Sequence, residues 1–300
     1  MKAKIKAVIK VIVFLIVAGL YLKFSSIIAA AEFTIPVPSA PGTAVQRNSK
    51  AIIDYSNAKD GYVQVKYMLD TTTQLRVIIK TPTGVSYSYH IKPGNFEVFP
   101  LSESNGSYSI GVYEQVEGTR FAIANTATIN VKLVNEFMPF LTPNQYVNFN
   151  KDSLTVKQAI ELVSGTAGLL DKIAAVYNYI INNFTYDKEL ASTVQSGYLP
   201  DVDAVLRRRR GICFDYAAVM TAMLRSQGIP CQLVVGYAGE IYHAWINVYS
   251  KETGWINKVI FFDGKNWKLM DPTFASSASQ SSEIMKFIGD GTNYRVRFRY

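Results

Sequence analysis

The sequence has 300 residues, of which 49% are hydrophobic and 18% charged, which excludes an intrinsically disordered chain and leaves room for two folded domains. The formal net charge is +8, but five lysines lie in residues 1–31, where no acidic residue occurs. The rest of the chain is only mildly basic, which argues against a nucleic acid as a partner. Nineteen tyrosines and sixteen phenylalanines are typical of a protein rich in β-structure.

The N-terminal segment, residues 1–31, has the pattern of an export signal. A lysine-rich start is followed by twelve uncharged residues between Lys10 and Lys23, whereas a membrane-spanning helix needs about 20. The small residues Ala29-Ala30-Ala31 provide a cleavage site, so we expect a secreted or cell-surface protein. An uncleaved anchor that contacts the membrane through residues 7–28 is the alternative, because the apolar run resumes after Lys23.

Two segments precede the second domain. Residues 32–49 hold three prolines and many small polar residues, which predicts a linker. Residues 50–135 contain seven short runs rich in β-branched and aromatic residues, separated by turn sequences such as Asn105-Gly106. Seven strands at this spacing predict an all-β immunoglobulin-like sandwich, and the lack of cysteine and tryptophan there excludes the antibody-type core. His90 has no cysteine or second histidine near it in sequence, so we expect it to be structural.

The period of the apolar residues changes in residues 136–300. A capping box from Thr155 to Gln158 predicts the start of a short helix. A longer helix is predicted over 169–183, another short one over 203–208 and a third helix over 213–227, and Gly228 stands where a helix-ending glycine is expected. Strands are predicted over 231–238, 243–250, 258–264 and 266–273. Helices followed by strands predict an α+β domain.

Both cysteines lie in this second domain. In an exported protein they form either a disulfide or one reactive and one buried thiol. Cys231 stands in an apolar strand and is expected to be buried, whereas Cys213 opens a helix, whose N-terminus lowers the pKa of a thiol. His243 is the sole histidine of this domain, and Asp271 ends a later strand. Cys213, His243 and Asp271 therefore predict a nucleophile, a general base and a carboxylate that orients the base.

The geometry of this site depends on how the strands pair. If 243–250 and 266–271 are neighbouring antiparallel strands, His243 and Asp271 meet at the helix tip, and Trp245 shapes the cleft. The histidines and cysteines do not have the spacing of a zinc site, and no dense acidic loop predicts calcium binding. We therefore expect no metal and no cofactor.

In their order along the chain, these motifs resemble the transglutaminase-like superfamily, which follows the papain-like plan. The matching motifs are Gly211-Ile212-Cys213, Gly228-Ile229-Pro230, His243-Ala244-Trp245 and Asp271-Pro272-Thr273. The resemblance covers about residues 165–280 and implies a papain-like catalytic domain with Cys213, His243 and Asp271 as its triad. The insertion at 251–262 is longer than in the shortest family members. Tyr186 stands where the family often has a tyrosine bordering the site, so it either donates to the oxyanion or only packs.

The resemblance implies acyl transfer through a thioester on Cys213. Water as acceptor gives a peptidase or amidase, which we favour, with a protein or peptide as substrate, including a cell-wall peptide. An amine as acceptor gives a cross-linking transglutaminase, and a non-catalytic surface binding module is a third hypothesis. Four arginines, 207–210, precede the motif. Arg210 is expected to favour the thiolate, and the other three to form a solvated face or to bind an anionic partner.

Overall fold

The computed structural model describes residues 33–257, 260–262, 267–269 and 294–300. The segment predicted as an export signal and the predicted triad residue Asp271 lie outside the described residues. The chain divides after Thr34, and the unit Ile35–Tyr300 holds every element named below. No helix in the described ranges is long and apolar enough to cross a membrane.

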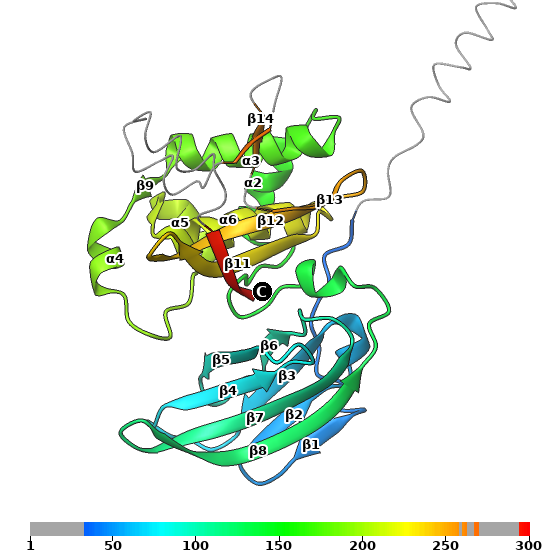
Figure 1. Ribbon diagram of the computed structural model, residues 1–300, viewed down its shortest axis with the longest axis vertical. Helices are drawn as coiled ribbons and strands as arrows, with labels where there is room; N and C mark the ends of the chain where they lie inside the picture. Colours follow the sequence, from blue (N-terminus) through cyan, green and yellow to red (C-terminus); the bar gives the residue numbers. More distant parts are fainter. Residues whose placement is uncertain (1–32, 258–259, 263–266, 270–293) are drawn as a thin grey trace, which may run out of the picture. The chain divides into compact units, whose positions relative to one another are not determined.

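The first half of this unit consists of two four-stranded antiparallel sheets (Figure 1). One has the strand order β1-β2-β3-β6 and the other β5-β4-β7-β8. The strands are β1 (Val45–Arg47), β2 (Ala51–Asp54), β3 (Tyr62–Tyr67), β4 (Leu75–Lys80), β5 (Ser86–Ile91), β6 (Glu97–Pro100), β7 (Gly106–Glu117) and β8 (Arg120–Val131). Short 3-10 helices, η1 (Ala58–Asp60) and η2 (Met138–Phe140), complete this half. The predicted β-rich N-terminal region is confirmed, and seven of its strands, β2 to β8, lie between residues 50 and 135.

The core of this half comes from alternating side chains. In β4, Leu75, Val77 and Ile79 are buried while Arg76 and Ile78 are partly exposed, as the period of two requires. Strand β1 lies in the predicted linker. Its three residues are all exposed, so no alternation marks it, and it forms by backbone pairing with β2.

The second half is an α+β domain. Its helices are α2 (Leu154–Val163), α3 (Leu169–Asn183), α4 (Lys188–Thr193), α5 (Val202–Arg208) and α6 (Cys213–Ser226). Its main sheet has the order β13-β12-β11-β16, built from β11 (Cys231–Ala238), β12 (Ile241–Ser250), β13 (Gly254–Ile256) and β16 (Tyr294–Arg299). Helix α6 packs against β11 and β12 and against α2, α3 and α5, so it is the central helix of the domain (Figure 1). The predicted fold class is confirmed.

Two small two-stranded pairs lie apart from this sheet. Strands β9 (Thr185–Tyr186) and β10 (Arg210–Gly211) are parallel, and β14 (Ile260–Phe262) and β15 (Trp267–Leu269) are antiparallel. The expected pairing of strands 243–250 and 266–271 is therefore wrong for the described residues, because β12 lies between β11 and β13. Strand β11 pairs on its other side with β16, a strand that the sequence pattern does not predict.

The capping box predicted at Thr155 is also wrong. Helix α2 begins one residue earlier, with Ser153 at its N-cap. The backbone N–H and the hydroxyl of Thr155 donate to the Asp203 carboxylate, at 2.9 and 2.8 Å, and Leu154 N–H donates to it at 3.0 Å. The first turn of α2 is thus capped by a residue of α5 rather than by Gln158, which a local sequence pattern cannot reveal.

The two halves share one hydrophobic core. Tyr87 and Tyr89 of β5 pack against the ring of Tyr300, with centroids 5.4 and 5.8 Å apart. The Ser102 hydroxyl donates to the main-chain oxygen of Arg299 at 2.7 Å, and the N–H of Arg299 donates to the Tyr87 hydroxyl at 3.1 Å. The all-β half therefore contributes directly to the packing of the α+β half.

Candidate active site

Cys213 is the first residue of α6, a helix buried from Asp215 to Ser226. This places the thiol at the positive end of the helix dipole, where a thiolate is stabilised. Cys213 is partly exposed and Cys231 is fully buried, and both thiols are free. The alternative of a disulfide between them is thus not what the structure shows. Burial raises the pKa of Cys231 to about 12, so that thiol stays protonated and inert at neutral pH.

The glycine two residues before the thiol has a steric reason. A Cβ on Gly211 would come within 2.6 Å of the Asp215 side chain. Asp215 is fully buried, and its carboxylate accepts the N–H of Ile212 at 2.9 Å, which closes the first turn of α6. A larger residue at 211 would displace this carboxylate and, with it, the helix start that carries Cys213.

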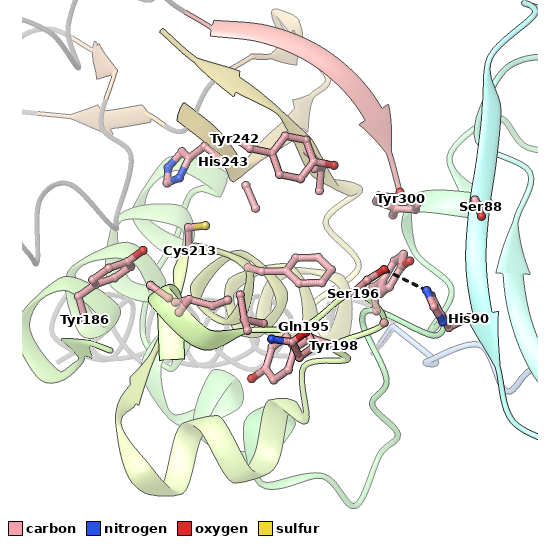
Figure 2. A pocket seen from close by; sticks show the side chains of 18 of the residues that line it. Ser88, His90, Tyr186, Gln195, Ser196, Tyr198, Cys213, Tyr242, His243 and Tyr300 are labelled. Atoms are coloured by element: carbon pink, nitrogen blue, oxygen red, sulfur yellow. Dashed lines mark hydrogen bonds between the residues drawn. The ribbon is translucent and has the colours of Figure 1, made fainter. Parts of the chain in front are cut away.

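His243 lies in β12, opposite Gly236 of β11. It is buried, and it lines the same cavity of about 460 Å3 as Cys213. Figure 2 shows the segment with Tyr242 and His243 crossing the cavity above the Cys213 thiol. A Cβ on Gly236 would lie 2.1 Å from the main-chain oxygen of Arg295, so glycine is required for β16 to pair this closely beside the His243 strand.

Backbone pairing between β9 and β10 places Tyr186 at the cavity. It lies beside Gly211 in the β9–β10 pair, which places it within two residues of Cys213 across the ladder. Its ring packs edge-on against Tyr216, at a centroid distance of 6.4 Å, and points toward Cys213 in Figure 2. This position suits a hydrogen-bond donor to an oxyanion formed near Cys213.

Two of the four arginines, Arg208 and Arg210, bind acidic and phenolic groups rather than the thiol. Arg208 donates to Asp215 at 3.4 Å and to the Tyr198 hydroxyl at 3.2 Å. Arg210 donates to Asp187 at 2.8 Å. The side chain of Arg208 is 42% exposed, so it lies on a solvated face as expected, and it also binds groups of the domain itself. Its charge offsets that of the buried Asp215 carboxylate, two residues after Cys213.

Burial and hydrogen bonding set the protonation of this cluster. Burial raises the pKa of Asp215, and the hydrogen bonds from Tyr198 and Ile212 and the charge of Arg208 oppose that rise. Burial, followed by the hydrogen bond to Asp215, raises the pKa of Tyr198 to about 12. Tyr198 therefore remains a donor at neutral pH, and its hydroxyl holds Asp215 at 2.6 Å.

The far wall of the cavity comes from the all-β half. Ser88 and His90 of β5 and Arg76 of β4 line it, and aromatic rings of Tyr146, Phe214 and Tyr300 complete the lining. His90 forms a hydrogen bond with the Ser196 hydroxyl at 3.1 Å, marked by the dashed line in Figure 2. From the sequence His90 is expected to be only structural, and its place in this cavity could not be predicted, since no local motif connects residues so far apart in the chain.

Trp245 does not have the role expected of it. It is 1% exposed and packs against Tyr294, at a centroid distance of 5.1 Å, outside the cavity lining. Among the residues that the structure describes, no group of three or more histidine, cysteine, aspartate or glutamate side chains is placed to hold a metal ion.

A thiol at the start of a central helix, with an imidazole from the adjoining antiparallel sheet in the same cavity, characterises a papain-like α+β domain. Residues 156–258 match the family model of the transglutaminase-like superfamily. This part of the chain is therefore similar to the transglutaminase-like superfamily, as its sequence motifs predict.

Two curated proteins match part of the chain. One is the uncharacterized protein YebA of Bacillus subtilis, 33% identical over 118 residues, and the other the Kyphoscoliosis peptidase of Mus musculus, 28% identical over 119 residues. The aligned parts are 33% and 36% of this chain but only 16% of each relative.

Similar solved structures include a proposed cysteine protease from Cytophaga hutchinsonii and the transglutaminase of red sea bream. The first has a TM-score of 0.40 and 17% identity, with 80% of this chain and 76% of that chain covered. The second has a TM-score of 0.32 and 11% identity, with 78% and 54% covered.

Proposed function

We propose that the protein is an exported, cysteine-dependent acyl-transfer enzyme that acts on peptide or carboxamide bonds, chiefly as a peptidase or amidase. The observation that carries this proposal is the partly exposed Cys213 at the start of α6, in one cavity with His243. The matched mouse relative is named as a peptidase, which favours hydrolysis over cross-linking. The proposed substrates of the present protein are proteins or peptides, including cell-wall peptides.

The proposed reaction has two halves. The sulfur of Cys213 attacks the carbonyl carbon after His243 accepts the thiol proton, and the oxyanion accepts hydrogen bonds from the Cys213 N–H and the Tyr186 hydroxyl. The C–N bond breaks, His243 returns the proton to the leaving amine, and a thioester remains on Cys213. Water then attacks this thioester, giving the acid and the free thiol. Asp271 is proposed to orient His243.

Two alternatives share these residues. An amine in place of water makes the same thioester an intermediate of protein cross-linking. A surface binding module would keep the fold without using the thiol. Incubating the wild type and Cys213→Ala with peptidoglycan peptides and proteins, with and without an added amine, separates the products by mass: cleavage, deamidation or a cross-link. An unchanged mixture with both proteins would favour the binding module.

Thiol reactivity tests the proposal without knowledge of the substrate. We expect iodoacetamide at pH 7 to label Cys213 at least about tenfold faster than an ordinary free cysteine, because His243 is proposed to accept the thiol proton as the sulfur attacks. His243→Ala is expected to remove this advantage. Cys231→Ala is the matched control and should leave the rate unchanged, since burial keeps that thiol protonated and inaccessible. Labelling of Cys213 at the rate of an ordinary cysteine would contradict the proposal.

A further inference from the structure

The all-β half places a cation in the wall of the candidate active site. Arg76 of β4 and His90 of β5 are register partners on neighbouring strands, so their side chains project from the same face of the sheet. Both line the cavity that contains Cys213, together with Ser88. This face belongs to the outer side of the sheet, since Tyr87 and Tyr89, which alternate with Ser88 and His90, are buried.

The charge of Arg76 is not neutralised within the described part of the protein. Its guanidinium lies over the ring of Phe121, at 4.7 Å from the centroid, and its Nε is buried without a hydrogen-bond partner. No described carboxylate forms an ion pair with it. An arginine is always charged, and a buried N–H without an acceptor is unfavourable, so an added acceptor would stabilise this side chain.

The rest of the described lining does not supply that acceptor. None of the cavity-lining residues is an aspartate or a glutamate. Burial, and then the positive charge of Arg76, lowers the pKa of His90, which indicates that the two side chains share one electrostatic environment. A group that enters beside Arg76 therefore meets net positive charge, which favours an anion and above all a planar carboxylate.

The wall that carries Arg76 is held against the catalytic side of the cavity. His90 forms a hydrogen bond with Ser196. The next residue, Gly197, has a backbone φ of +89°, which favours glycine, and a Cβ there would lie 3.0 Å from the His90 ring. The neighbouring Tyr198 is bonded to Asp215 at the start of α6. The loop at residues 196–198 thus contacts both β5, the strand next to Arg76, and the start of α6, the helix that bears Cys213. These contacts hold the two sides of the cavity in place.

We propose that Arg76, beside His90, is a carboxylate-binding subsite of this cavity, so that the preferred peptide carries an acidic group on the part that lies over β4 and β5. The carboxylate is either that of a glutamate or aspartate side chain or that of a free C-terminus. The inference deepens the proposed function and rests on it for its catalytic meaning, whereas the binding preference is measurable without turnover.

The test uses the full chain with Cys213→Ala, which binds peptides without converting them. Three pools of hexapeptides with random sequence serve as probes: one with a fixed glutamate and blocked ends, one with glutamine in its place, and one with glutamine and a free C-terminal carboxylate. Retention by the immobilised protein is read by mass spectrometry. We expect one of the two carboxylate pools to be retained about tenfold more than the blocked glutamine pool, as a charge-assisted bidentate bond predicts.

The variants make the assignment specific. Arg76→Gln should abolish the preference, and Arg76→Lys should restore part of it, because a lysine keeps the charge but not the planar fork. Lys80→Gln is the matched control: Lys80 is an exposed cation of the same strand that does not line the cavity, and its loss should change nothing. Equal retention of the three pools, or a preference that survives Arg76→Gln, would overturn the inference. Slow labelling of Cys213 by iodoacetamide would instead count against the proposed function and leave this measurement intact.

Discussion

At the scale of single residues, the protein contains one fully buried arginine that has three partners. Arg225 donates to the main-chain oxygens of Cys231 at 2.9 Å, Thr142 at 2.8 Å and Tyr300 at 2.7 Å. Burial lowers its pKa to about 10, so it still carries its charge at neutral pH. One side chain thus donates to main-chain oxygens of three segments that are far apart in the sequence, and the Tyr300 oxygen also accepts the N–H of Leu233 at 3.0 Å.

Removing this side chain should be costly. We predict that Arg225→Met lowers the free energy of unfolding by about 3 kcal/mol or more, since the carbonyl oxygens lose their donors in a place that water does not reach. Urea unfolding followed by circular dichroism measures the change. Arg207→Met, at an exposed arginine of α5, serves as the control and should alter stability by less than about 0.5 kcal/mol. A similar loss in both variants would show that Arg225 has no special role.

At the scale of elements, the start of α6 depends on a buried carboxylate. Asp215 binds the N–H of Ile212, the hydroxyl of Tyr198 and, at a longer distance, the guanidinium of Arg208. Because burial raises the pKa of Asp215 above its ordinary value of 3.8, the native protein binds this proton more readily than the unfolded chain. This contribution to stability is therefore fully present below pH 3.8 and is lost as the pH rises through the native pKa.

The substitution Asp215→Asn should remove this dependence. We predict that, compared with the wild type, the free energy of unfolding of this variant falls less, or rises more, as the pH increases from about 4 upward. Urea titrations at several pH values measure both slopes. Asp152→Asn, at an exposed aspartate before α2, is the control that should keep the wild-type slope. Identical slopes in all three proteins would rule out a shifted pKa at Asp215.

Much of the element order could be predicted from the sequence, and the reasons differ between elements. The seven predicted strands of the all-β half and helices α3 and α6 carry clear periods, and Gly228 ends α6 with a positive φ of 72°. Strands β1 and β16 lack such a signal, since they exist through pairing with β2 and β11. The cap of α2 by Asp203 depends on a contact between helices that are distant in the chain.

The residues of the candidate site also fall into two groups, those that the sequence predicts and those that it does not. Cys213 and His243 could be chosen from the sequence because each stands in a motif, and the structure places both in one cavity. Arg76 and His90 could not be chosen, because their relevance arises only when β4 and β5 meet the loop around Ser196. Local patterns report local geometry, whereas a cavity wall built by a second half of the chain is a product of tertiary packing.

At the scale of the whole molecule, the shared core has consequences for folding. All three tryptophans, Trp245, Trp255 and Trp267, lie in the α+β half, so their fluorescence reports mainly on that half. Hydrogen exchange in β4 and β7 reports on the other half. Because Tyr89 packs against Phe99 of the all-β half and also against Tyr146 and Tyr300, the two halves should stabilise each other.

We predict a single cooperative unfolding transition, with both probes giving the same urea midpoint. Tyr89→Ala should lower both midpoints together, by a loss of about 3–5 kcal/mol that is typical of truncating a buried aromatic side chain. Phe121→Ala, at a partly exposed ring on the outer side of the sheet, is the control and should have a much smaller effect. Two separate midpoints would show that the halves fold independently.

The four arginines at 207–210 should differ in the substitutions that each position tolerates. These four identical side chains occupy four unlike environments, so a saturation scan should return four unlike profiles. Position 207 faces solvent and accepts most polar residues, while 208 demands a long donor that reaches Asp215. Position 209 has a φ of +49°, so glycine or asparagine should be at least as acceptable there as arginine. Position 210 favours a donor for Asp187. Four consecutive arginines in the sequence are therefore expected to evolve under four different structural constraints.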